Sequence, residues 1–161
     1  MSEQESARER LHTYLNDHLA GSVAAIELLD DLIEHHSEDR FGKTFRDLRD
    51  EIEADQESLR DLIRKLGAKE SAMRKAGAWL AEKFTRVKIG DADDGAGLLQ
   101  ALEALALGIT GKQLLWRSLA AIAPNFPALQ GTDFSELETR AHDQFEWVEG
   151  LRLEMARETF R

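Results

Sequence analysis

Polar side chains that can bind a metal ion recur on or beside the apolar faces of the long helical stretches of this sequence. Imidazole and carboxylate groups are common protein ligands of iron and manganese, and residues three or four apart on a helix share a face. Ser22, Gln113 and Gln144 add hydroxyl and amide groups at similar places. The candidate metal ligands on or beside these faces are His18, Glu51, Asp55 and Glu138.

Two further candidate ligands, His142 and Glu103, lie off the faces. Glu103 shares the polar strip of its helix with Thr110 and Arg117, and an ordinary solvated position is the favoured alternative for it.

Asp55 is the candidate whose position demands an explanation. It falls on the apolar stripe of its segment, and burying an unpaired carboxylate costs several kcal/mol. A protonated His18 or a metal ion would compensate its charge. Three arrangements follow: His18 and Asp55 hydrogen-bond each other or lie at stripe edges in reach of water, a single divalent ion binds, or a di-metal centre forms. We favour the first.

The elements that position these groups are predicted to be helices. Only two prolines occur, at 124 and 127, and apolar residues recur at helical spacing elsewhere. We expect Gly67 to end the second helix and Asp133 or Ser135 to cap the last one. The sequence therefore predicts one all-α domain over residues 1–161, with helices at about 7–36, 42–66, 71–88, 97–123 and 134–160.

The segment 97–123 is predicted to be the central helix, because it is apolar around most of its circumference. Its only charged residues are Glu103, Lys112 and Arg117. Small residues along one side favour the close approach of another backbone, and these are Ala101, Ala104, Gly108 and Gly111.

Two long helices, a crossover of about 30 residues and two further long helices form an order that resembles the ferritin-like superfamily. The resemblance implies a ferritin-like four-helix bundle with an extra crossover helix. It also implies two iron or manganese ions, held by one Glu from each of two helices and a Glu-x-x-His from each of the others. A ferroxidase or oxidase activity, or a role in stress, would follow from it.

The ligand pattern of that superfamily is not matched here. The only Glu-x-x-His is Glu9 to His12, which points away from the apolar stripe at the start of the first helix. The second helix has no histidine, and His142 lies about 115° from the centre of its stripe at 100° per residue. We therefore expect a lost or reduced metal site, with no cofactor, rather than an iron or manganese centre.

Composition excludes several kinds of chemistry. The chain of 161 residues has no cysteine, which removes disulfides, thiolate metal sites and a cysteine nucleophile. Its net charge of −10 disfavours nucleic acid as a partner. The charged first residues lack the apolar stretch of a signal peptide, and no segment is long enough to span a bilayer, so we expect a cytoplasmic protein.

These observations favour a non-catalytic helical-bundle protein that acts through a partner surface. Leu28, Trp79 and Trp147 lie off the main stripes, which is compatible with a homodimer. One alternative is a di-iron or manganese carboxylate protein. Another is binding to an anionic membrane through the segment 64–88, which holds eight Lys or Arg and two Glu.

Overall fold

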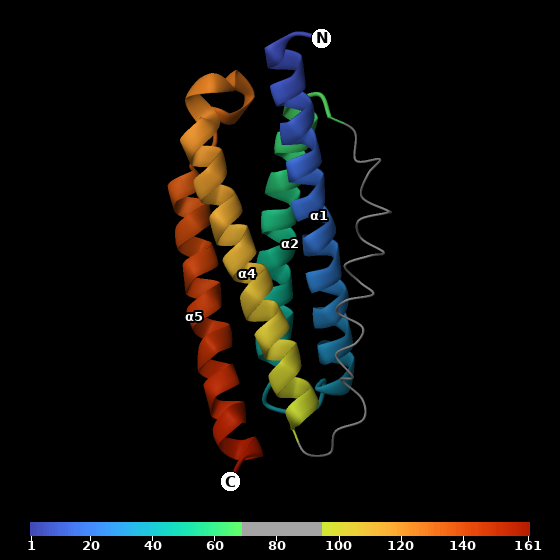
Figure 1. Cartoon of the computed structure of the whole chain (residues 1–161). Coiled ribbons are helices and arrows are strands. Elements are labelled where there is room, and N and C mark those ends of the chain that lie inside the picture. Colours follow the sequence, from blue (N-terminus) through green and yellow to red (C-terminus); the bar gives the residue numbers. More distant parts are fainter. Residues whose placement is uncertain (69–94) are drawn as a thin grey trace.

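The computed structural model describes residues 1–68 and 95–161, which form an all-α structure of long helices (Figure 1). No strand occurs in these two ranges, as predicted, and the predicted helix at 71–88 lies outside them. Two short 3-10 turns, η2 (Ala123–Asn125) and η3 (Pro127–Leu129), contain the two prolines. The long helices are α1 (Glu3–His35), α2 (Gly42–Lys65), α4 (Ala96–Ile122) and α5 (Phe134–Thr159).

Local hydrogen bonds determine where the helices begin and end. Helix α1 begins four residues before the predicted start at about residue 7 because Ser2 and Glu5 form a reciprocal capping box. Gly67 adopts a φ of 73° after α2, a left-handed conformation that ends the helix as predicted. Of the two predicted caps of α5, Asp133 is the one used, since its carboxylate accepts a hydrogen bond of 3.0 Å from the N–H of Glu136.

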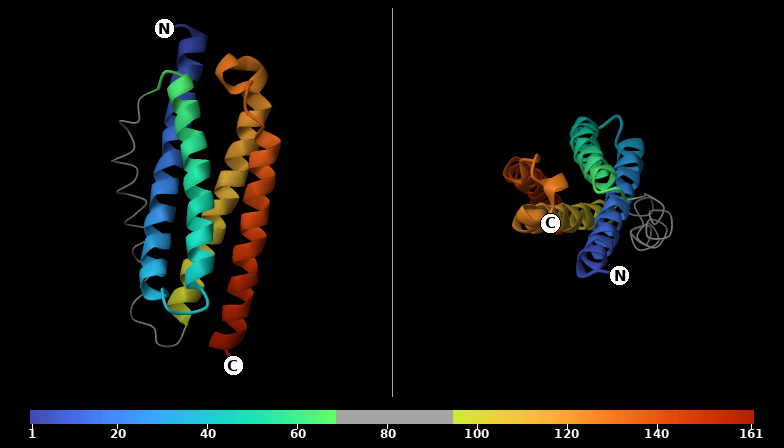
Figure 2. Two further views of the ribbon diagram at one scale, coloured as in Figure 1. Left: turned by 180° about the vertical axis from the view of Figure 1, so that it is seen from behind. Right: turned by 90° about the horizontal axis from the view of Figure 1, so that it is seen from above.

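The helices form two antiparallel hairpins, α1–α2 and α4–α5, that pack against each other. The end of α2 and the beginning of α4 lie at opposite ends of the bundle, so α2 and α4 run in the same direction (Figures 1 and 2). Each hairpin is tightly packed internally, and between the hairpins α1 and α4 approach most closely. No helix in the described ranges combines the length and apolar character needed to cross a membrane.

Leucine side chains from α1, α2 and α4 make up most of the core, as the apolar stripes predict. The largest fully buried side chains are Leu15, Leu19, Leu29, Leu32, Phe45, Leu48, Leu62, Ile63, Leu102, Leu105, Leu115 and Trp116. Two of the residues expected on a partner surface belong to this interior instead: Leu28 is buried and Trp147 is half-buried against the core. The third, Trp79, lies outside the described residues.

We predicted that neighbouring helices enclose α4. It packs against both α5 and α1, but it is not enclosed on all sides. Leu107 is 74% exposed and Leu114 is 54% exposed. An apolar helix is normally surrounded by neighbours, so this outer face of α4 is an exception within the fold.

Candidate functional site

A buried polar cluster joins the two hairpins on the side where α2 faces α4 and α5. Asp55 occupies the buried stripe of α2 between Ile52 and Leu59 and is only 1% exposed. Lys112 of α4 places its Nζ 2.6 Å from Asp55 Oδ2, and Arg140 of α5 places a terminal nitrogen 3.2 Å from Oδ1. The carboxylate therefore lies between two cations from the opposite hairpin.

Gln144 of α5 connects the members of this cluster. Its Nε2 donates hydrogen bonds to Asp55 Oδ2 at 3.1 Å and to Glu51 Oε2 at 2.9 Å, and its Oε1 accepts one from Lys112. Burial lowers the pKa of Lys112, while the charge of Asp55 acts in the opposite direction. Two carboxylates and two cations balance within the cluster, which is how a buried ion pair avoids an uncompensated charge.

This arrangement differs from the partner we predicted for Asp55. The carboxylate bonds to Lys112 and Gln144 and pairs with Arg140, and no hydrogen bond joins it to His18. The same hypothesis also allowed His18 to lie at the edge of its stripe, and His18 is half-buried in the structure. In the sequence, Lys112 is one of only three charged residues in the segment 97–123. A lysine in so apolar a helix needs a counter-ion, and this need was the feature of the sequence that could have pointed to Lys112 as a partner of a buried carboxylate.

The remaining candidate ligands do not converge on one point. Glu51 joins the cluster through Gln144, whereas Glu138 pairs with Arg117 at 2.5 Å. Glu103 lies 3.7 Å from a terminal nitrogen of Arg152, and His142 is exposed on α5.

The residues present do not fit a di-metal centre. In residues 1–68 and 95–161, no group of three or more His, Asp or Glu could hold a metal ion. The two carboxylates that do lie together, Glu51 and Asp55, share their surroundings with two cations and an amide. Asp55 Oδ2 bonds to Lys112 and Gln144, and Asp55 Oδ1 lies 3.2 Å from Arg140 without a hydrogen bond. A divalent ion there would compete with the Lys112 ammonium for the same carboxylate.

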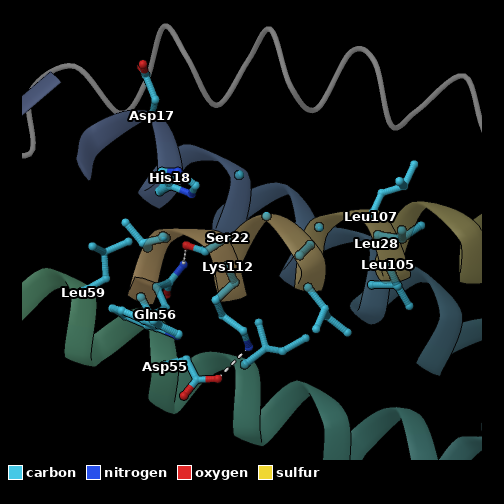
Figure 3. Close-up of a pocket in the computed structure, with 18 of the residues that line it drawn as sticks. Asp17, His18, Ser22, Leu28, Asp55, Gln56, Leu59, Leu105, Leu107 and Lys112 are labelled. Carbon is cyan, nitrogen blue, oxygen red and sulfur yellow. Dashed lines mark hydrogen bonds and ion pairs between the residues drawn. The ribbon is translucent and has the colours of Figure 1, made fainter. Parts of the chain in front are cut away.

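A cavity of about 650 Å³ lies beside the cluster, between α1, α2 and α4. Figure 3 shows Lys112 reaching from α4 along this cavity to Asp55 on α2. Next to it, Gln56 Nε2 donates to Ser22 Oγ at 2.9 Å, and the Ser22 hydroxyl donates to the Leu19 carbonyl at 2.6 Å. The polar groups of this wall therefore bond to one another.

The rest of the lining is mainly apolar and includes several small residues, with Asp17 and His18 of α1 among its further polar side chains. Gly108 and Gly111 border it from the middle of α4, and a Cβ added at either position would meet no atom of the described residues within 4 Å. The close backbone approach that we predicted for this side of the helix is therefore not made by the described part of the chain. Glycine inside a helix costs about 1 kcal/mol relative to alanine, and here it leaves space open.

Two side chains at the cavity have unused hydrogen-bonding capacity. His18 packs edge-on against Tyr14, with 4.8 Å between ring centroids, and makes no hydrogen bond to the described residues. Burial lowers its pKa and the charge of Asp17 opposes the shift, so the folded protein favours the neutral imidazole. Trp116 is 1% exposed, and its Nε1 has no acceptor in the described ranges.

Comparison of the chain with known protein families, with characterised proteins and with solved structures gives no match.

Proposed function

We propose that this protein binds an uncharged, largely apolar small molecule in the cavity between α1, α2 and α4, without chemically changing it. The observation that carries the proposal is the cavity itself. Its volume of about 650 Å³ falls within the range of roughly 300–1,000 Å³ that is typical of small-molecule sites. Mainly apolar walls with a few polar groups on one side are also typical of such sites.

The charges around the cavity favour an uncharged ligand. Lys112 and Asp55 compensate each other, and burial lowers the pKa of His18, which favours its neutral imidazole. The carboxylate of Asp17 is directed away from the other labelled side chains (Figure 3). A charged ligand group would lose its hydration without gaining a counter-ion.

The hydrogen bonding of Lys112 and Asp55 argues against a catalytic role for these two residues. Lys112 and Asp55 direct their polar atoms to each other and to Gln144. General acid or base catalysis needs a group within hydrogen-bond reach of the substrate, and these two groups are already engaged.

We also infer that the chain is a ferritin-like four-helix bundle with a reduced metal site. Two hairpins with parallel α2 and α4 are the connectivity of that superfamily, in which metal ions supply the positive charge between the hairpins. Here Lys112 and Arg140 supply it. The alternative of a di-iron or manganese carboxylate protein is disfavoured by the donor set described above. Membrane binding through the segment 64–88 stays a prediction, since most of that segment lies outside the described residues.

Titration with N-phenyl-1-naphthylamine, an uncharged fluorescent probe, tests the binding proposal. We expect a saturable rise in fluorescence with one site per chain. The variant Gly108→Leu/Gly111→Leu places two side chains at the cavity wall, where each Cβ has open space, and we expect it to abolish probe binding.

Gly150→Leu provides the matched control, because Gly150 is a helical glycine with open space on α5 away from the cavity. Its probe binding should equal that of the wild type. Unchanged binding in Gly108→Leu/Gly111→Leu, or no binding in the wild type, would contradict the proposal.

A further inference from the structure

One face of α4 exposes large apolar side chains, of which Leu107 also lines the cavity. Leu107 and Leu114 are the most exposed large apolar residues within any of the described helices, at 74% and 54%. They are seven residues apart, so they lie on the same face two helical turns apart. Exposed apolar groups that line up in this way are typical of an interaction surface.

Three further residues complete a stripe along this face, which we call the outer stripe. Its members follow one another at intervals of four, three, four and three residues, and they lie within an arc of about 80° at 100° per residue. This is the spacing of a helix that packs against another helix. The outer stripe consists of Glu103, Leu107, Thr110, Leu114 and Arg117.

The outer stripe is nearly symmetric about its centre, except that its charges are opposite at the two ends. A leucine lies on each side of Thr110, with Glu103 beyond one and Arg117 beyond the other. Both charged residues are exposed. An antiparallel copy of the helix would therefore meet leucine with leucine and acid with base at both ends.

We propose that a second copy of this chain docks on the outer stripe, with the two α4 helices antiparallel and the twofold axis near Thr110. The interface is isologous, because the same patch of each protomer faces its counterpart. It brings Glu103 of each protomer opposite Arg117 of the other. A parallel pairing would instead place like charges opposite each other at each end.

The existing ion pairs leave both charged residues able to take part. Arg117 bonds to Glu138 through its Nε at 2.5 Å, and a guanidinium has four further N–H donors. Glu103 lies 3.7 Å from Arg152, which is a loose pair on the surface. Charge complementarity therefore argues for a second copy rather than another occupant of this face.

Disulfide trapping tests the orientation directly, because the chain contains no cysteine. Thr110→Cys is expected to form a covalent dimer on mild oxidation, since the two residues lie near the axis. Two copies of Glu103→Cys would lie about 21 Å apart, at 1.5 Å per residue and seven residues on either side of the axis. That is far beyond the Cα separation of roughly 7 Å that a disulfide allows.

Glu103→Cys alone should therefore stay uncrosslinked, whereas a mixture of Glu103→Cys and Arg117→Cys should give a heterodimer. A covalent dimer from Glu103→Cys alone, or its absence from Thr110→Cys, would overturn the antiparallel arrangement.

The mass of the protein in solution provides the second measurement. We expect the wild type to have twice the 18.2 kDa chain mass by light scattering, and Leu107→Asp/Leu114→Asp to be a folded monomer by circular dichroism and mass. Leu153→Asp, which changes an exposed leucine of α5, is the matched control and should remain dimeric. The proposal would be overturned if the wild type were monomeric. It would also be overturned if Leu153→Asp were monomeric while Leu107→Asp/Leu114→Asp remained dimeric.

Discussion

The two sides of the contact between the hairpins are built in opposite ways. On the side of α2 and α5, Asp55 forms hydrogen bonds with Lys112 and Gln144 and an ion pair with Arg140. On the side of α1 and α4, apolar and small residues border a cavity of about 650 Å³. Buried polar groups require specific partners, whereas apolar walls can face an empty space or a ligand.

This difference suggests a division of roles between the two sides. The polar cluster fixes how the hairpins pair, because a shift of one helix would leave Asp55 without its cations. The cavity side tolerates a hollow, because most of the residues that line it are apolar. Lys112 belongs to both sides, with its ammonium in the cluster and its side chain along the cavity.

The largest expected effect comes from breaking the polar side. Lys112→Met leaves Asp55 buried with only Arg140 as a cation, and removing one partner of a buried ion pair typically costs about 3–5 kcal/mol. We expect a loss of this size in the free energy of unfolding measured with urea. Lys43→Met removes an exposed lysine on α2 and should cost less than about 1 kcal/mol.

A double variant distinguishes the interaction between Asp55 and Lys112 from the contribution of each residue alone. Asp55→Leu/Lys112→Met removes both charges, so its loss should be smaller than the sum of the two single losses. Additive losses, or a Lys112→Met variant as stable as the wild type, would mean that the cluster does not hold the hairpins together.

A smaller effect of opposite sign is expected on the hollow side. Gly108→Ala should raise the free energy of unfolding by about 1 kcal/mol, because alanine favours the helix and its Cβ meets no neighbouring atom. Gly95→Ala should lower it, since Gly95 has a φ of 79° and its added Cβ would lie 2.8 Å from Thr159 Oγ1. Urea denaturation measures the free energy of unfolding of both variants and so checks the two predictions. If Gly108→Ala lowered the free energy of unfolding, this would indicate that other atoms already occupy the space beside Gly108.

The sequence predicted the helices well because their signals are local. Apolar spacing and residues such as Gly67 and Asp133 act within a few positions, so most predicted ends lie within one residue of the observed ones. The start of α1 was missed because the capping box of Ser2 precedes the apolar stripe that identified the helix.

The site was harder to predict because it depends on contacts between helices. That Asp55 needs a cation followed from its position on the stripe. That the cation is Lys112 depends on how α4 packs against α2, 57 residues away in sequence, and spacing along one helix does not contain that information. The exposure of Leu107 was missed for a similar reason, since a helix this apolar is normally enclosed.

The smallest effect concerns pH and the cavity. Burial lowers the pKa of His18 from its ordinary value of 6.5, so the unfolded chain binds a proton more readily than the folded one. As the pH falls through 6.5, the wild type should lose stability relative to His18→Leu, whose position 18 has no proton to bind.

We expect the difference in unfolding free energy between His18→Leu and the wild type to change from pH 8 to pH 5 in favour of the variant. A difference that is the same at both pH values would contradict this burial of the imidazole. Protonation also places a charge at an apolar cavity, so binding of the uncharged probe should weaken over the same pH range in the wild type and not in His18→Leu. The pH response thus belongs to the hollow side of the contact, where burial opposes protonation of His18 and the charge of Asp17 offsets that effect only in part.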